Sequence, residues 1–258
     1  MKRLFFLTLV AVLCCGSLEV GAQTKTFKRP ALKVSPTEDA SQFVNLAEAI
    51  PDIILEIRYY STYNFVGTRI DGYLEPVALL TKRAADSLKV VNDELMQQGY
   101  RLKIFDAYRP QCAVDHFIRW SSDLSDTLMK PYFYPQVPKE MHYKWGYLAK
   151  KSNHTKGSTV DLTLFDMSTG KEVDMGAPFD WFGVESHVDF GGDPDTGKYK
   201  PNGRITEEQF RHRMILRRAM MRHGFKPVST EWWHFTLINE PFPNTYFTFP
   251  VKTLTHKP

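Results

Sequence analysis

Two short segments of the sequence carry residues that together could hold a divalent cation. The first places His154 and Asp161 seven residues apart, with Gly157 between them. The second contains Glu231 and His234, three residues apart, near the C-terminus. A catalytic zinc takes three protein ligands and leaves a fourth position for water. We therefore predict that His154, Asp161 and His234 hold one zinc ion per chain and that Glu231 acts on its water.

This ligand set predicts hydrolysis of an amide. A zinc ion held by two imidazoles and a carboxylate acidifies its bound water and polarises a carbonyl. A peptidase also needs a base that passes the proton of this water to the leaving amine. Glu231 would stay near the metal if His234 is a ligand, but on a regular strand the two side chains would point to opposite faces. We therefore expect Glu231 on a turn or bulge where the strand begins.

Other histidines compete for the role of ligand. Taken alone, His154 would be interpreted as a structural or surface histidine and Glu231 as a surface charge. His187 with Asp189 could form a metal pair, and two further histidines could be ligands: His116 and His142. We interpret these three as non-ligands, with His187 as the first alternative.

Arg109 follows the predicted strand 102–107 and precedes Pro110. Two roles are open for this side chain. It could form a structural salt bridge with a nearby acid, or it could be a permanently charged donor to an oxyanion.

The hydrophobic pattern predicts the elements that must position these residues. We expect strands over 52–60, 102–107, 159–164, 225–228 and 232–238. We expect helices over 81–98, from 111 to 120 or beyond, and from 206 to 224. Strands and helices do not alternate strictly, which favours an α+β fold. The predicted architecture is a single domain with a central, mainly antiparallel sheet, flanking helices and metal ligands that project from the sheet.

Three features of the predicted helices can be checked. Thr81 should cap the helix that follows it, and Thr206 with Gln209 should form a capping box. In the last helix the apolar face should contain Phe210, Met214 and Met221. The basic side chains of 211–222 should form its solvated face, and we expect no nucleic-acid partner.

The composition indicates one exported domain. The chain has 258 residues, of which 43% are hydrophobic, and its net charge is +4. Lys2 and Arg3 precede the apolar run 4–15, which is too short to span a bilayer and is typical of a signal peptide. We predict a signal peptide over 1–22, an N-terminal extension over 23–41 and the catalytic domain over 42–258. The protein would be periplasmic, with no membrane span.

The cysteines leave one question of targeting open. Cys14 or Cys15 could instead be a lipoprotein cysteine, although the residues before them match the usual pattern poorly. Cys112 is the one cysteine beyond the signal, so the mature chain forms no internal disulfide. We expect Cys112 to be a small buried residue. The aromatic segment 130–151 should be an ordered loop against the site.

The set of motifs resembles a known family. Ser152-x-His154-x-x-Gly157-x-x-x-Asp161, followed by Glu231-Trp-Trp-His234, resembles the zinc D-alanyl-D-alanine dipeptidases of the VanX type, which belong with D,D-carboxypeptidases and hedgehog-like domains. The resemblance covers roughly residues 50–237 and includes further matching segments in the same order: Tyr59, Asn64-Phe65-x-Gly67, Asp71-Gly72-Tyr73, Ala107-Tyr108-Arg109-Pro110 and Met175-Gly176-x-x-Phe179-Asp180.

This resemblance implies roles for individual residues. It implies the three zinc ligands already named, with Glu231 as general base and Arg109 as donor to the tetrahedral oxyanion. It implies that Ser152 binds the substrate carboxylate and that Tyr59 and Asp180 surround the amino end. The implied partner is a small D,D-dipeptide, and the implied reaction converts D-Ala-D-Ala to two D-alanines.

The sequence leaves several alternatives open. A D,D-carboxypeptidase that trims longer wall peptides would use the same chemistry. A zinc-containing domain that only binds peptidoglycan fragments would need neither the base nor the oxyanion donor, and both are present. The preferred dipeptide, the oligomeric state and the choice between antibiotic resistance and wall recycling are not specified by the residues.

Overall fold

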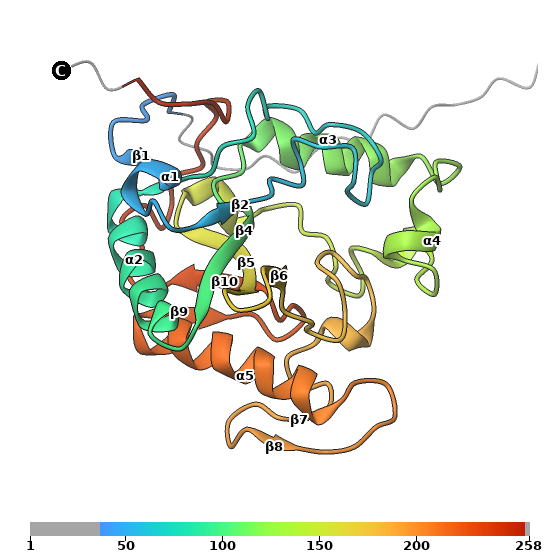
Figure 1. Ribbon diagram of the computed structural model, residues 1–258. Helices are drawn as coiled ribbons and strands as arrows, with labels where there is room; N and C mark the ends of the chain where they lie inside the picture. The colour runs from blue at the N-terminus through green and yellow to red at the C-terminus, as the bar shows by residue number, and fades with distance from the viewer. Residues whose placement is uncertain (1–36, 256–258) are drawn as a thin grey trace, which may run out of the picture. The chain divides into compact units, whose positions relative to one another are not determined.

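The computed structural model describes residues 37–255, and a mixed sheet lies at their centre (Figure 1). Within these residues six strands follow the order β2-β4-β5-β10-β9, with β6 paired to β5. The strands are β2 (Ile54–Leu55), β4 (Tyr100–Asp106), β5 (Thr159–Asp166), β6 (Lys171–Glu172), β9 (Phe225–Pro227) and β10 (His234–Leu237). β2 pairs with β4 in parallel, and the other pairings are antiparallel. The predicted α+β class with a mainly antiparallel sheet is confirmed.

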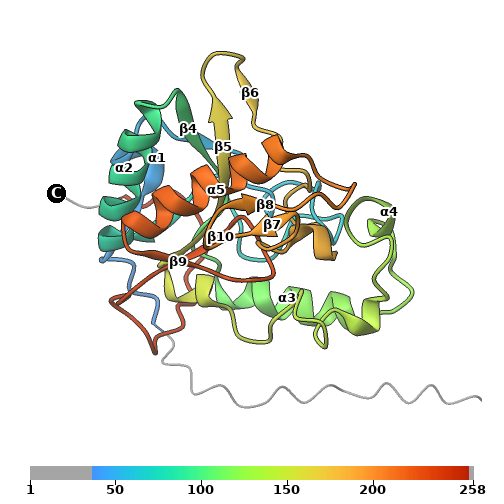
Figure 2. The same cartoon turned by 90° about the horizontal axis from the view of Figure 1, so that it is seen from below.

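Helices cover both faces of this sheet (Figures 1 and 2). α2 (Lys82–Met96) and α5 (Glu207–Arg222) pack together on one side, and α3 (Gln111–Ser122) lies on the other. The shorter elements are α1 (Leu46–Ala49), α4 (Lys130–Phe133), three 3-10 turns (Lys139–Met141, Asn153–Lys156 and Val184–Ser186), the pair β1 (Phe43–Asn45) and β3 (Leu79–Thr81), and the pair β7 (Gly192–Asp193) and β8 (Lys198–Tyr199). The described chain holds no helix that combines the length and apolar character needed to cross a membrane.

The register of three neighbouring strands brings charged residues to one end of the sheet. Asp161 of β5 lies opposite His234 of β10. On the other side of β5, a register shift after Ile104 places Asp106 of β4 opposite Asp161. Because directly paired residues on adjacent strands have neighbouring side chains, this end of the sheet concentrates polar groups in the interior.

The strand predicted over 52–60 is wrong in extent, because only Ile54–Leu55 forms a strand. The backbone N–H groups of Glu56 and Arg58 still donate to carbonyls of β4. Beyond them the chain turns into a loop that the side chain of Asn64 organises through bonds to five backbone groups. A polar side chain that satisfies the backbone locally competes with strand pairing.

The two predicted caps have different outcomes. The Thr81 cap is wrong: its side chain makes no capping bond, and its Oγ1 lies 2.8 Å from Oγ of Ser158. The capping box is confirmed, since Thr206 Oγ1 accepts from the N–H of Gln209 at 3.2 Å and Gln209 Oε1 accepts from the N–H of Thr206 at 2.8 Å.

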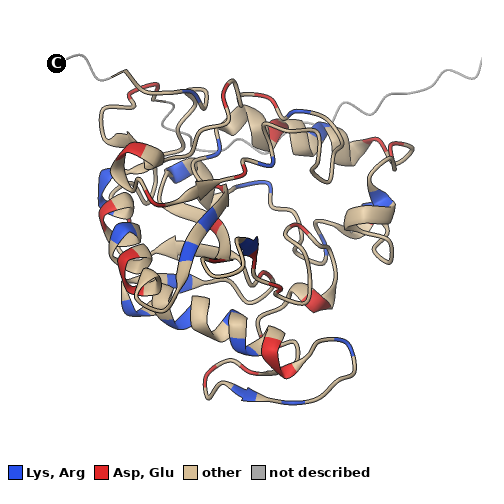
Figure 3. Ribbon diagram, viewed as in Figure 1, with Lys and Arg blue, Asp and Glu red and all other residues tan. Residues whose placement is uncertain are grey.

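The predicted faces of α5 are partly wrong. Phe210 and Met214 are buried, but Met221 is 46% exposed because the last turns bury a different side of the helix. Arginines recur along α5 (Figure 3). Arg213 is an exception within the predicted solvated face 211–222, since it is only 2% exposed.

Several expectations concern other parts of the chain. Cys112 is exposed on α3, so its predicted burial is wrong. The segment 130–151 is ordered by α4 and a 3-10 turn, as predicted. The predicted signal peptide over 1–22, with Cys14 and Cys15, lies outside the described residues, as does most of the extension 23–41.

Candidate metal centre and active site

A capped 3-10 turn positions His154. The turn spans Asn153–Lys156, and Ser152 Oγ accepts a hydrogen bond from the N–H of His154 at 3.2 Å. Gly157 ends the turn at a φ of +78°, where a β-carbon would lie 2.3 Å from the ring of Phe43. Glycine is therefore required here for both the backbone conformation and the available space. The residues between His154 and Asp161 thus determine the position of the His154 imidazole.

A backbone carbonyl sets the tautomer of His154. Its Nδ1 lies 2.7 Å from the carbonyl oxygen of Ala107, which can only accept a hydrogen bond. Nδ1 therefore carries the proton and Nε2 presents a lone pair. A histidine that ligates through one nitrogen usually donates from the other in this way.

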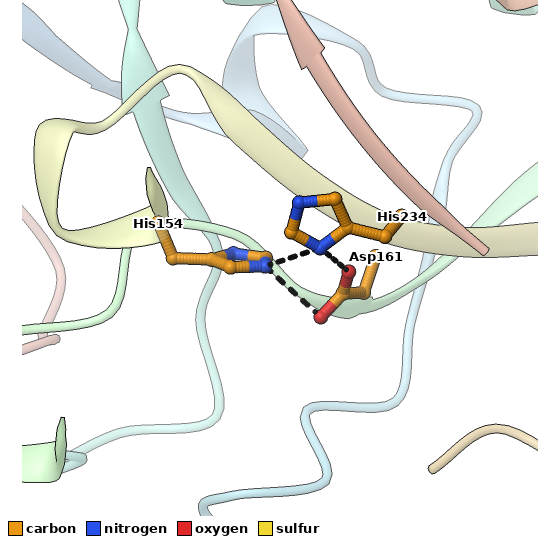
Figure 4. Close-up of side chains that lie close together, drawn as sticks. All are labelled: His154, Asp161 and His234. Carbon is orange, nitrogen blue, oxygen red and sulfur yellow. Dashed lines mark hydrogen bonds and ion pairs between the residues drawn. The ribbon is translucent and has the colours of Figure 1, made fainter. Parts of the chain in front are cut away.

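The side chains of His154, Asp161 and His234 converge on one point (Figure 4). Nε2 of His154 lies 3.2 Å from Nδ1 of His234 and 3.2 Å from Oδ2 of Asp161. Nδ1 of His234 lies 3.1 Å from Oδ1 of Asp161. One candidate ligand atom from each residue lies within 4.8 Å of the others, and among residues 37–255 this is the group that could hold a metal ion.

The donor set fits a divalent cation such as zinc. Oδ1 of Asp161 is buried and forms no hydrogen bond, and it lies 3.1 Å from Nδ1 of His234, where a shared cation would satisfy both atoms. Burial would raise the pKa of Asp161, but the imidazoles of His154 and His234 outweigh burial and lower it. Burial would lower the pKa of His234, but the Asp161 carboxylate reverses this effect and raises it. A cation would compete with that proton, because metal binding to such sites releases protons.

Glu231 lies beside this cluster on the turn that precedes β10, as predicted. Its Oε2 is 3.4 Å from Nδ1 of His234. Burial raises the pKa of Glu231 to about 7, although the nearby His234 opposes this shift. A carboxylate with such a pKa can both accept and release a proton near neutral pH.

Arg109 reaches the same cluster from the chain that follows β4. Its Nη2 lies 3.4 Å from Oδ2 of Asp161, and its Nε donates to Oδ2 of Asp106 at 2.9 Å. The guanidinium lies 4.8 Å from the ring centroid of Tyr59. Burial would lower the pKa of Arg109, but the surrounding acidic groups raise it, so the charge is fixed. Arg109 therefore forms the salt bridge of the first alternative and also lines the cavity, and its role as donor to an oxyanion stays a prediction.

Sequence reasoning missed Asp106. This carboxylate is 1% exposed, accepts from the hydroxyl of Tyr73 at 2.6 Å and holds Arg109 in place. Burial raises the pKa of Asp106, although the Arg109 guanidinium opposes the shift. The sequence feature that could have identified Asp106 is its position three residues before Arg109, in the same short motif.

Tyr59 and Asp180 form a second polar group. The hydroxyl of Tyr59 lies 3.2 and 3.1 Å from the two carboxylate oxygens of Asp180. Asp180 stands in the left-handed region at a φ of +62°, and burial together with the Asp161 charge raises its pKa well above the usual range. Each non-glycine residue held in this conformation costs stability and is often found at functional sites.

All residues assigned to the site from the sequence line one cavity. They are Tyr59, Arg109, Ser152, His154, Asp161, Asp180, Glu231 and His234. The cavity has a volume of about 200 Å³, and Gly146, Tyr147 and Leu148 of the aromatic segment also line it. This segment therefore lies against the site, as predicted.

The competing histidines are elsewhere. His187, His116 and His142 do not line the cavity and are not part of the candidate metal cluster among the described residues. His116 lies 3.2 Å from Asp71 on the surface, and His142 is packed among aromatic rings. His187 is partly buried, and burial lowers its pKa.

Comparison with known proteins agrees with this geometry. Residues 39–252 match the family described as D-ala-D-ala dipeptidase. The chain belongs to the D-ala-D-ala dipeptidase family. It is 36% identical over 210 residues to the D-alanyl-D-alanine dipeptidase of Enterococcus faecium. These aligned residues make up 81% of this chain and 98% of the relative.

Other members of the D-ala-D-ala dipeptidase family show similar coverage. The enzyme of the same name from Streptomyces coelicolor is 36% identical over 209 residues, 81% of this chain and 98% of the relative. That of Escherichia coli (strain K12) is 32% identical over 199 residues, 77% of this chain and 86% of the relative. The family resemblance inferred from the motifs is confirmed.

Proposed function

We propose that this chain is a zinc-dependent dipeptidase that hydrolyses D-Ala-D-Ala to two D-alanines. The observation that carries the proposal is the position of Glu231 beside the His154, Asp161 and His234 cluster, on the wall of a small cavity. The relatives named D-alanyl-D-alanine dipeptidase support the choice of substrate. The two imidazoles and one carboxylate support zinc, because catalytic zinc sites commonly use three such ligands.

Glu231 is the proton carrier in this proposal. A bound zinc supplies an acidified water and polarises the substrate carbonyl. Glu231 takes one proton from the water as its oxygen bonds to the carbonyl carbon. It then delivers that proton to the amide nitrogen while the C–N bond breaks, which gives a carboxylic acid and an amine; the acid then passes its remaining proton to the amine, so that the final products are a carboxylate and an ammonium group.

Arg109 stabilises the charge that develops on the carbonyl oxygen. Asp106 holds its Nε, and its Nη2 faces Asp161 in the cavity. The guanidinium cannot lose its proton, so it remains a charged donor throughout the reaction. A donor held in place before the reaction needs no reorganisation as the negative charge grows.

Tyr59, Asp180 and Ser152 would hold the two ends of the dipeptide. The ammonium group would lie against Asp180, where an adjacent positive charge favours the ionised carboxylate. Ser152 accepts from the backbone of His154, so its own hydroxyl proton remains available to the substrate carboxylate. These three roles follow from the family resemblance and from the lining of the cavity.

The small cavity favours a dipeptide over a longer wall peptide. Its volume of about 200 Å³ lies below the ~300–1,000 Å³ of common ligand pockets. Product analysis with zinc-loaded protein tests this choice. We expect D-alanine from D-Ala-D-Ala, with little product from L-Ala-L-Ala or from a pentapeptide ending in D-Ala-D-Ala. Comparable kcat/KM on the pentapeptide would favour a D,D-carboxypeptidase, and no cleavage of either would favour a binding domain.

We also propose that the protein is exported and acts on fragments of peptidoglycan outside the cytoplasm. The support is the basic and apolar N-terminal sequence 2–15 and the small residues before Gln23. N-terminal sequencing of the mature protein should begin at Gln23. A mature protein that begins at Cys14 or Cys15 and partitions with membranes would show that it is lipid-anchored instead.

A further inference from the structure

Arg213 is a buried arginine in the middle of α5. Its side chain reaches two backbone carbonyl groups that lie outside this helix. Nε donates to the carbonyl of Met175 at 2.6 Å, and Nη1 donates to the carbonyl of His187 at 3.2 Å. These two residues are the ends of a segment that contains Asp180, which we call the Asp180 loop (residues 175–187). One guanidinium therefore joins both ends of this loop to α5.

The Asp180 loop also holds the turn that contains Glu231. Nε1 of Trp232 donates to the carbonyl of Ala177 at 3.1 Å, and its backbone N–H donates to the carbonyl of Ser186 at 2.9 Å. The Arg213 guanidinium lies 6.0 Å from the ring centroid of Trp232. Because Trp232 follows Glu231 directly, the contacts of Arg213 lead to two residues that line the cavity, Asp180 and Glu231.

Burial of the Arg213 charge is costly, and the charge of Asp174 offsets only part of this cost. Arg213 is 2% exposed, and within residues 37–255 it forms no direct ion pair. Its Nη2 is buried without a hydrogen-bond partner, and burial lowers its pKa to about 10. A buried charge without a counter-ion destabilises a fold, whereas charge-assisted bonds to the two carbonyls are strong and directional. The two hydrogen bonds that hold the ends of the Asp180 loop are thus the main favourable interactions of this side chain.

We propose that Arg213 is a positioning residue that fixes Asp180 and Glu231 and so gives the site its requirement for a free amino end. Asp180 depends on this support because its backbone stands at a φ of +62° and its carboxylate is held by the single side chain of Tyr59. A loop released from α5 would let Asp180 leave that conformation. The inference rests on the proposed dipeptidase activity for its kinetic test.

The kinetic test compares two substrates in the zinc-loaded full chain. For Arg213→Met, kcat/KM should fall for D-Ala-D-Ala, mainly through KM. The preference for D-Ala-D-Ala over N-acetyl-D-Ala-D-Ala should fall about tenfold or more, because a site with a misplaced acceptor discriminates less. Arg213→Lys should recover part of the preference, since an ammonium reaches one carbonyl. Arg211→Met, an exposed position on the same helix, is the control and should match the wild type.

A merely structural role gives a different result. If Arg213 only stabilises the fold, a smaller folded fraction lowers both rates equally, and the preference between substrates stays unchanged; that result overturns the proposal. If the wild-type chain cleaves neither substrate, the proposed function fails. Hydrogen exchange then still decides the question of Arg213. The amides of residues 175–187 should exchange faster in Arg213→Met, with β4 and β5 unchanged, and unaltered exchange in that loop would contradict the inference.

Discussion

Replacing Arg109 by alanine should damage both catalysis and stability, by separable mechanisms. The loss of a preorganised donor to an oxyanion typically costs ~10²–10³ in kcat. The same change leaves the Asp106 carboxylate, 1% exposed, without its cation. Breaking a buried ion pair in this way costs about 3–5 kcal/mol. For a chain of this size, each kcal/mol lowers Tm by about 2–4 °C, so Tm should fall by roughly 6–20 °C.

A second substitution separates the two effects. Adding Asp106→Asn to Arg109→Ala removes the uncompensated charge but keeps an acceptor for the Tyr73 hydroxyl. Tm should therefore recover in part, while kcat on D-Ala-D-Ala should stay low. Steady-state kinetics, zinc content and calorimetry on the same preparations provide the measurements. If kcat recovers together with Tm, or if kcat per folded molecule never fell, Arg109 serves the scaffold and not the reaction.

Three further predictions concern the metal, a glycine and a buried histidine. A chelator should abolish activity. His154→Ala and His234→Ala should each lose zinc by metal analysis, while His187→Ala retains about one equivalent. Loss of zinc in His187→Ala would show that the ligand histidines are wrongly assigned. Gly157→Ala should lower the free energy of unfolding in urea by about 2–6 kcal/mol, from backbone strain and overpacking, and an unchanged value would show that the turn relaxes. Burial lowers the pKa of His142 to about 4, so the unfolded chain binds its proton first as pH falls below its usual value near ~6.5. Stability should therefore fall from pH 6.5 toward 4, and His142→Phe should reduce that slope in urea titrations; an identical slope would exclude this histidine.

Local signals in the sequence predicted much of the site and several helix ends. The capping box of Thr206 and Gln209 depends on residues three apart, and the 3-10 turn that carries His154 ends at a glycine nearby. The pairing of Asp161 with His234 joins distant segments, but the shared ligand chemistry indicated it. The capping box and the glycine that ends the turn need no knowledge of how the chain packs.

Features that depend on the particular partner of a polar side chain could not be predicted from the sequence. Thr81 forms a bond to Ser158 instead of capping its own helix. The strand predicted over 52–60 is short because Asn64 organises the following backbone. The burial of Arg213 depends on carbonyl groups some 26 and 38 residues away in the chain. For Thr81 and Arg213 a tertiary contact outweighs the local pattern, and for the strand a local side-chain bond competes with strand pairing.

The most direct test of the account is the turnover of D-Ala-D-Ala by Glu231→Gln, with zinc content measured on the same sample. The glutamine keeps the shape of the side chain but cannot accept the proton of the attacking water. We expect one bound zinc, an unchanged fold and a loss of kcat of at least ~10²–10⁴-fold, as is typical of general acid–base catalysis. A variant that retains its zinc and near-normal kcat would contradict the central claim that Glu231 carries the proton in this site.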